Sequence, residues 1–182
     1  DIILRNLDRA NDLVGHFKQV AVDQASENLR EINIYEYINE IVESMTLLIK
    51  RKNIKAYIHC PKNIKVNTYP GPIYQIISNL INNSILHGFE QKNEGNITVS
   101  VDISKHRMTL TYLDDGIGMT TEMLNNIYEP FVTSKRNQGG SGLGMNIVYN
   151  LVTQVLEGEI SCQSTLGSGV DINVSCPIYV CP

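Results

Sequence analysis

The sequence Asn-Leu-Ile-Asn-Asn-Ser-Ile-Leu-His at residues 79–87 decides how the rest of the chain is interpreted. It lies in a helix predicted over about residues 73–90. Because side chains four positions apart share a helix face, Asn79, Asn83 and His87 form one polar stripe. The opposite face is expected to pack on a sheet and carries Ile73, Ile76, Ile77, Leu80, Ile81, Ser84 and Ile85.

Helical and extended patterns alternate along the rest of the chain. Residues 96–104 and 108–113 alternate apolar and polar side chains, so they are expected to pair as a hairpin. The other expected elements are helices over 35–51, 122–127 and 143–156, strands over 32–34 and 56–60, and a second hairpin over 159–165 and 169–178. The expected fold class is α+β, a two-layer α/β sandwich in which three helices cover one face of a mixed, mostly antiparallel sheet.

The first part of the chain, residues 1 to about 30, has the pattern of one long helix. Its apolar side chains recur at steps of three and four, which gives a narrow stripe suited to packing against another helix. Because the first residue already lies inside this pattern, the chain is expected to be a piece of a longer protein. The expected organisation is a leading helix over residues 1–31 and a globular domain over residues 32–182.

Composition restricts the class of protein. The net charge of −4 over 182 residues gives no general electrostatic reason to expect nucleic acid or an anionic membrane as partner. The apolar stretches are too short to span a bilayer, and no signal peptide is evident. The cysteines form no Cys-x-x-Cys pair, which favours free thiols in a reducing cytoplasm over a Cys176–Cys181 disulfide. A cytoplasmic domain is therefore expected, whose parent protein can still be membrane-anchored.

The sequence Asp-Asp-Gly-Ile-Gly-Met at residues 114–119 follows the second strand of the first hairpin. A carboxylate at a strand end can accept a hydrogen bond from an exocyclic amine, and glycines let the backbone approach a flat ring. This pattern predicts a base-binding loop, although Asp-x-Gly-x-Gly alone is also common in ordinary turns.

The sequence Gly-Gly-Ser-Gly-Leu-Gly at residues 139–144 precedes a predicted helix. Glycines there allow backbone amides to face phosphate, helped by the positive end of the helix. No strand leads directly into this loop and no P-loop Lys-Ser/Thr follows, so neither a dinucleotide fingerprint nor a P-loop is indicated. Residues 129–136 between the two loops are expected to form a lid whose Lys135 or Arg136 meets terminal phosphates; the alternative is an ordinary exposed basic loop.

The asparagines of the polar stripe allow two interpretations. One is a solvated helix face. The other is an amide oxygen offered by Asn83 to Mg²⁺, a hard cation that combines a few protein oxygens with substrate phosphate oxygens.

The combination of these motifs resembles a known family. The resemblance is to the catalytic, ATP-binding domain of bacterial sensor histidine kinases, within the GHKL superfamily of Hsp90, DNA gyrase B, MutL and anti-sigma-factor kinases, whose ATP fold is the Bergerat fold. Residues 1–30 are similar to the second helix of the dimerisation and phosphotransfer hairpin that precedes this domain. The family carries four sequence motifs, which are called the N, G1, F and G2 boxes. Four stretches of this chain resemble them in order and spacing: residues 79–87, 114–118, 130–131 and 140–144.

The resemblance implies a role for each matching position. Asn83 resembles the asparagine that binds Mg²⁺, and Asp114 resembles the aspartate that reads the adenine amine. Phe131 would anchor the lid, and Lys135 is the candidate contact for the γ-phosphate. The full set of expected nucleotide-binding residues is Asn79, Asn83, His87, Asp114, Gly116, Ile117, Gly118, Met119, Phe131, Lys135, Gly140, Ser141, Gly142, Leu143 and Gly144.

Position 79 discriminates within the superfamily. Members that hydrolyse ATP carry a glutamate one turn before the metal asparagine, where it acts as general base for water. This chain has Asn79 there, and an amide cannot take a proton. Phosphoryl transfer to a protein acceptor is therefore expected in place of hydrolysis, because such transfer relies mainly on positioning and charge neutralisation.

Three positions depart from the family pattern. Leu86 stands where a basic residue is common, so neutralisation of phosphate would fall on His87, Lys135 or Arg136. Val170 stands where the last hairpin often carries threonine. None of the four histidines is followed by an acidic residue, so the phosphate-accepting histidine is expected outside this chain.

The expected function is that of an ATP- and Mg²⁺-dependent kinase domain that transfers the γ-phosphoryl group to that histidine, for relay to a response-regulator aspartate. The expected partners are a response-regulator receiver domain and a second copy, joined through the hairpin of the full-length protein, with no nucleic acid or membrane contact in this piece. Two alternatives remain: an anti-sigma-type serine kinase, which the leading helix argues against, and a degenerate, non-catalytic module used for protein contact.

Overall fold

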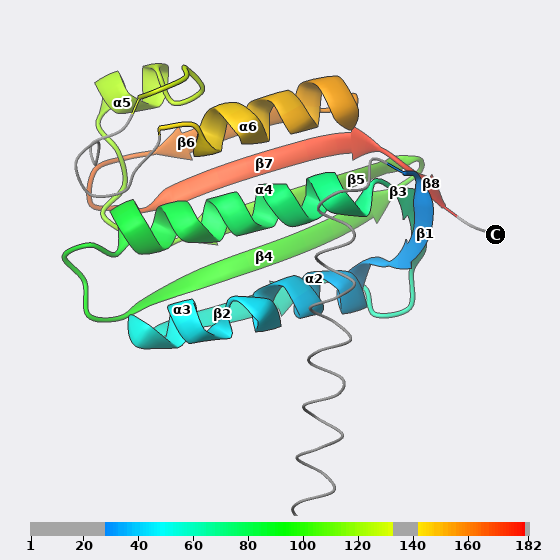
Figure 1. Ribbon diagram of the computed structural model, residues 1–182, viewed down its shortest axis with the longest axis horizontal. Coiled ribbons are helices and arrows are strands. Elements are labelled where there is room, and N and C mark those ends of the chain that lie inside the picture. The colour runs from blue at the N-terminus through cyan, green and yellow to red at the C-terminus, as the bar shows by residue number, and fades with distance from the viewer. Residues whose placement is uncertain (1–27, 133–141, 181–182) are drawn as a thin grey trace, which may run out of the picture.

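A five-stranded sheet forms one layer of the domain in the computed structural model, which describes residues 28–132 and 142–180 (Figure 1). The strand order is β2-β4-β5-β7-β6, and β2 and β4 run parallel while every other pair is antiparallel. The predicted mixed, mostly antiparallel sheet is thus confirmed. The strands are β2 (Ile54–His59), β4 (Gly95–Ser104), β5 (Arg107–Asp114), β6 (Glu159–Ser164) and β7 (Val170–Pro177).

Helices form the second layer and cover one face of the sheet (Figure 1). The central helix, α4, contacts α2 on one side and α6 on the other. This arrangement confirms the predicted two-layer sandwich with three helical segments on one face. The helices are α2 (Ile34–Ser44), α3 (Thr46–Arg51), α4 (Pro70–Asn83), α5 (Thr121–Asn125) and α6 (Gly144–Asn150), with π-helical turns η1 (Ser84–Gly88) and η2 (Leu151–Val155) continuing α4 and α6.

The core lies between the two layers and consists of aliphatic and aromatic side chains. Strands β4 and β5 bury every second residue, as a sheet with one covered face requires. Burial of this apolar surface is the main favourable term in folding, at roughly 25 cal/mol per Å². The largest fully buried side chains are Tyr112, Phe89, Ile34, Ile38, Ile41, Ile73, Ile76, Ile77, Leu80, Ile81, Ile97 and Met108.

Two local signals position the helical layer. The Asn33 side chain caps α2 by accepting hydrogen bonds from the amides of Tyr35 and Glu36, at 3.1 and 3.3 Å. Pro70 and Pro72 lie in the first turn of α4, where no intrahelical partner is lost. The helix therefore begins at Pro70, three residues before the predicted start.

Some elements differ from the sequence prediction. A small antiparallel sheet joins β1 (Arg30–Asn33), β3 (Lys65–Thr68) and β8 (Tyr179–Val180); β3 and β8 were not predicted. The helix predicted over 35–51 is divided at Met45, where ψ is 2°. Residues 1–27, including most of the predicted leading helix, lie outside the described residues, so that helix stays a prediction.

No helix within residues 28–132 and 142–180 combines the length and apolar character needed to cross a membrane. In that same part of the chain, Cys60, Cys162 and Cys176 are free thiols, as predicted.

Candidate functional site

A cavity of about 480 Å³ lies beside the C-terminal half of α4, between the loop after β5 and the beginning of α6. We call it the α4–α6 cavity. Its polar side chains come from the helix and from the end of β5, while its walls are mainly apolar. The lining residues are Asn79, Leu80, Asn82, Asn83, Ser84, Leu86, His87, Gly88, Glu90, Tyr112, Asp114, Ile117, Gly118, Met119, Met123, Ile127, Val132, Gly142, Gly144, Met145, Leu166, Val170 and Ile172.

At one end of this cavity, two amide oxygens face the beginning of α6. The Asn79 amide nitrogen donates to the backbone carbonyl of Gln75 at 2.8 Å, which leaves its oxygen available on the other side. A Cβ atom at Gly144 would lie 3.3 Å from Asn83 Oδ1 and 3.4 Å from Asn79 Oδ1. A side chain at position 144 would therefore occupy space beside both oxygens.

The donor types at this end suit a magnesium ion that is shared with phosphate. Within the described residues, no group of three or more His, Cys, Asp or Glu side chains is placed to hold a metal. Mg²⁺ usually takes one or two protein oxygens and completes its octahedron with water and substrate phosphates. Neutral amide oxygens from Asn83 and Asn79 meet that requirement without repelling a polyphosphate.

The Asp114 carboxylate also lines the cavity, and the residue is 8% exposed. Its Oδ1 accepts a hydrogen bond from the Gly116 amide at 2.9 Å, and its Oδ2 accepts one from Ser84 Oγ at 2.5 Å. Burial raises the pKa of Asp114 above its usual value, while hydrogen bonds from Ser84, Gly116 and Val170 lower it. The carboxylate keeps lone pairs available for a donor in the cavity.

Close backbone contacts fix the loop after Asp114. The Ile117 amide donates to the carbonyl of Gly88 at 2.9 Å, which ties the loop to the end of η1. A Cβ at Gly116 would lie 2.8 Å from the Gly88 backbone, and one at Gly118 would lie 2.1 Å from the carbonyl oxygen of Thr165. These glycines are therefore needed because other backbone occupies the space of a side chain.

The backbone before residue 132 and the backbone after residue 141 meet beside α6. The Phe131 amide donates to the carbonyl of Gly142 at 2.9 Å, and both residues have positive φ angles, 65° and 68°. Asn146 on α6 also donates to the carbonyl of Tyr128 at 2.9 Å. Val132 and Gly142, the described residues on either side of residues 133–141, both line the cavity.

The structure brings nine of the predicted site residues together around one cavity. These are Asn79, Asn83, His87, Asp114, Ile117, Gly118, Met119, Gly142 and Gly144.

The other predicted positions do not line the cavity or are not described. Gly116 packs against the Asp114 side chain and the Gly88 backbone, and Leu143 immediately precedes α6. The Phe131 side chain is 61% exposed, so its part in joining the loop ends comes from its backbone. Lys135, Arg136, Gly140 and Ser141 lie outside the described residues.

Two buried hydroxyls at the cavity were not identified as functional from the sequence. Ser84 was assigned to the face of α4 that packs on the sheet, and it is indeed 3% exposed. Its hydroxyl nevertheless contacts both Asp114 and Tyr112. The available signal was the alternation of β5, which places Tyr112 on the same inward face as Asp114.

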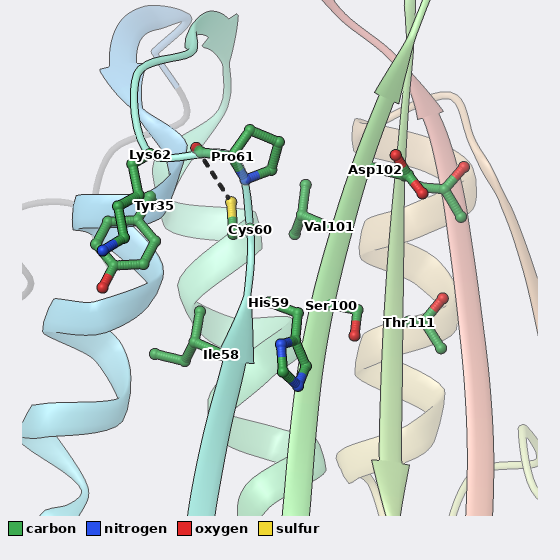
Figure 2. A pocket seen from close by; sticks show the side chains of 11 residues that line it. Tyr35, Ile58, His59, Cys60, Pro61, Lys62, Ser100, Val101, Asp102 and Thr111 are labelled. Carbon is green, nitrogen blue, oxygen red and sulfur yellow. Dashed lines mark hydrogen bonds between the residues drawn. The ribbon is translucent and has the colours of Figure 1, made fainter.

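A second hollow, of about 660 Å³, lies along β2, β4 and β5 (Figure 2). Figure 2 shows His59, Ser100 and Thr111 on neighbouring strands, with α4 and α6 behind the sheet. Burial raises the pKa of the nearby Cys60 thiol to about 11, so this thiol stays protonated at neutral pH. Although it is larger, this hollow has neither glycine-rich loops nor a buried carboxylate, and the α4–α6 cavity is the better candidate.

Amide oxygens from one helix, a buried carboxylate at a strand end and close-packed glycine loops around one cavity define an ATP-binding domain on a two-layer sandwich. Residues 68–180 match the family described as histidine kinase-, DNA gyrase B- and HSP90-like ATPase, and the chain belongs to this family. Within it, the chain is a catalytic ATPase domain of the sensor histidine kinase type.

Known relatives agree with this assignment. The chain is 33% identical over 182 residues to the autoinducer 2 sensor kinase/phosphatase LuxQ of Vibrio vulnificus strain CMCP6, covering 92% of this chain and 20% of LuxQ. The chain therefore spans about a fifth of this relative's length.

Solved structures share the fold. The nucleotide-free catalytic domain of histidine kinase ThkA matches with a TM-score of 0.72 and 23% identity, covering 82% of this chain and 95% of that domain. Histidine kinase ThkA in complex with the response regulator protein TrrA matches with a TM-score of 0.66 and 21% identity, covering 97% of this chain and 49% of that chain.

Proposed function

We propose that the α4–α6 cavity binds ATP with Mg²⁺ and presents the γ-phosphoryl group to a histidine outside this chain, for relay to a response-regulator aspartate. The observation that supports this most directly is the placement of the Asn83 amide oxygen and the Asp114 carboxylate on the walls of the same cavity. The cavity volume of about 480 Å³ lies within the usual range for small-molecule sites.

The Asp114 end suits an adenine base. A carboxylate that accepts hydrogen bonds only can pair with an exocyclic amine, and its two oxygens are already oriented by Ser84 and Gly116. Ile117 and Met119 line the cavity near this carboxylate and give apolar walls against which a ring can pack. Gly118 has a φ of 67°, which lets the loop turn without a side chain in the way.

The Asn83 end suits the metal and the phosphates. Asn83 would hold Mg²⁺ through its amide oxygen, with Asn79 one turn earlier facing the same space. Bound Mg²⁺ would neutralise charge on the phosphates during transfer. His87 also lines the cavity and, with Lys135 on the connecting segment, is proposed to contact the phosphates.

The side chain at position 79 favours transfer over hydrolysis. Asn79 donates its amide hydrogen to the carbonyl of Gln75, and an amide has no basic lone pair with which to activate water. We therefore propose that the domain holds the nucleotide for an external acceptor.

The partners follow from the same proposal. ThkA has been solved in complex with the response regulator TrrA, which supports a receiver domain as partner of the parent protein here. We also propose that the leading helix, predicted over residues 1–31, belongs to a dimerisation hairpin and pairs with a second copy of the chain. Its predicted end is corrected by the structure, which places Arg30 and Glu31 in β1.

Calorimetric titration of the chain with ADP, with and without Mg²⁺, tests the binding part of this proposal. We expect micromolar-to-millimolar binding that Mg²⁺ strengthens, that Asp114→Ala removes and that Asn83→Ala makes insensitive to Mg²⁺. Thr111→Ala is the matched control, because Thr111 lies on the opposite face of the sheet and pairs with Asn173 at 2.7 Å. No binding by the wild-type chain would favour a non-catalytic module. The observation that favours this alternative is Leu86, which lies on the cavity wall in place of a basic residue.

The transfer part needs a separate experiment. The chain is incubated with labelled ATP and a dimerisation hairpin that carries an acceptor histidine. Label on the hairpin that is lost in acid but retained in base indicates phosphohistidine. Acid-stable label would instead point to a serine kinase.

A further inference from the structure

Three buried oxygen-bearing groups form a continuous hydrogen-bonded chain at the base end of the α4–α6 cavity. Ser84 Oγ lies 2.7 Å from the Tyr112 hydroxyl and 2.5 Å from Asp114 Oδ2. Tyr112 is 1% exposed, Ser84 is 3% exposed and Asp114 is 8% exposed. The hydrogen-bonded chain begins in the core at Tyr112 and ends at the Asp114 carboxylate, which lines the cavity.

The direction of this hydrogen-bonded chain follows from a count of protons. An ionised carboxylate only accepts, so Ser84 must give its single proton to Asp114. Ser84 Oγ is then an acceptor toward Tyr112, so the tyrosine hydroxyl must be the donor. Burial raises the pKa of Tyr112 well above its ordinary value, which keeps that proton on the hydroxyl.

Two local features bring these groups together. Ser84 is the first residue of the π-helical turn η1, where the Phe89 amide bonds the Ser84 carbonyl at 2.7 Å and the helix is wider than an α-helix. Tyr112 and Asp114 are two residues apart on β5 and share its inward face. The end of α4 and the end of β5 thus supply the two sides of the contact.

We propose that Tyr112 and Ser84 are positioning residues that hold the Asp114 carboxylate ionised and oriented, and thereby select a base with an exocyclic amine at the recognised edge. This inference rests on the proposed function. Ser84 and Gly116 donate to the two Asp114 oxygens from within the protein. The lone pairs that remain toward the cavity can accept a hydrogen bond from a ligand. A purine with a 6-oxo group would place a second acceptor against these lone pairs. An unsubstituted purine would offer them no donor.

Other titratable groups near the carboxylate do not take over this role. Asp115 is adjacent in sequence, but its carboxylate oxygens accept from the amide and the side chain of Asn96 at 2.8 and 2.6 Å. The Cys162 thiol on β6 is half-buried, and burial raises its pKa to about 12, so it carries no charge at neutral pH. His87 and Glu90 line the cavity from η1 and the turn that follows it.

The test compares two ligands, ADP and the diphosphate of unsubstituted purine riboside, which lacks the 6-amino group. For Ser84→Ala we expect about a tenfold loss of ADP affinity, because an oriented hydrogen bond to a buried charge is removed. Affinity for the unsubstituted purine diphosphate should stay within about twofold, since that ligand does not use the carboxylate as acceptor. Tyr112→Phe should give a smaller ADP-specific loss of about threefold, and Thr111→Ala should change neither affinity.

A double variant separates this role from simple stabilisation. Ser84→Ala alone leaves the buried Tyr112 hydroxyl without its acceptor, whereas Ser84→Ala with Tyr112→Phe removes both partners. The double variant should therefore be at least as stable toward urea as Ser84→Ala, yet its preference for ADP should remain weakened. The preference of Ser84→Ala for ADP should also disappear at a higher pH than that of the wild type, because the carboxylate loses a donor that favours ionisation.

Equal losses for both ligands, or an unchanged ratio of affinities in Ser84→Ala, would overturn the positioning role while leaving the proposed function intact. A wild-type chain that binds neither ligand would overturn the proposed function, and the positioning role with it.

Discussion

Replacing Gly169 by alanine is expected to destabilise the domain strongly and to disturb Asp114, whereas the same replacement at Gly167 is expected to do much less. Both glycines lie in the turn between β6 and β7 and both have positive φ angles, 77° and 88°. Their surroundings differ. A Cβ at Gly169 would lie 1.9 Å from the carbonyl oxygen of Asp114, while a Cβ at Gly167 has no atom within 4 Å.

The magnitudes follow from that difference. The left-handed backbone conformation costs an alanine about 1–2 kcal/mol, and this cost applies at both positions. At Gly169 the Cβ must also move from 1.9 Å to an ordinary carbon–oxygen separation of about 3.3 Å, so the two backbones must separate by roughly 1.4 Å. Overpacking of this kind costs about 1–3 kcal/mol or more. We therefore expect about 1 kcal/mol for Gly167→Ala and about 3 kcal/mol for Gly169→Ala.

Urea unfolding of the two variants measures these free energies, and ADP titration reports on the site. Gly169→Ala should also weaken ADP binding, because Val170 is the register partner of Asp114 and its amide helps to hold that carboxylate. Gly167→Ala should bind ADP like the wild type. If the two variants lose the same stability to within about 0.5 kcal/mol, the argument from close backbone contact is refuted.

Three further outcomes are expected. The ratio of affinities for ADP and for unsubstituted purine diphosphate should be constant at alkaline pH and fall on acidification, because protonation removes the charge of Asp114 and turns one of its oxygens into a donor. Burial raises its pKa, so the fall should begin at a higher pH than for an exposed aspartate, and a flat ratio down to pH 4 would contradict this. Gly95→Ala should destabilise the domain by about 2–4 kcal/mol in urea, since its Cβ would lie 2.2 Å from the buried Phe89 ring; loss of less than about 1 kcal/mol would show that the ring moves freely. Gly144→Ala should weaken ADP binding in the presence of Mg²⁺ more than in its absence, because its Cβ would lie 3.3 Å from Asn83 Oδ1; equal weakening would argue against a metal at this end.

Much of the fold could be predicted because its long elements have clear periodicities. Strand β5 alternates buried and accessible residues over its whole length and β4 does so from Gly95 to Asp102, and their register continues to the turn at Ser104 and Arg107. Strands β3 and β8 have four and two residues, too few for an alternation to be recognised. The division at Met45 was also missed, because the apolar pattern continues across it and Met45 itself is buried.

The candidate site was predictable where a residue type carries its own chemistry. Asn83 and Asp114 were chosen for their oxygens, and the structure places both on one cavity. Ser84 was misjudged because helix periodicity correctly indicates burial but says nothing of a polar partner on another element. The alternation of β5 indicates that Tyr112 shares the inward face of Asp114, but an inward tyrosine on a strand is interpreted as part of the core until its hydroxyl is seen beside Ser84.

The backbone hydrogen bond between Phe131 and Gly142 has an evolutionary consequence. Because this bond and the contact from Asn146 to Tyr128 fix both attachment points, the connection between them can change in length while the remaining cavity walls keep their positions. Doubling the length of a connection whose ends are held together costs only about 0.6 kcal/mol in chain entropy. Insertions and deletions should therefore accumulate between residues 132 and 142 faster than in the strands and helices around the nucleotide.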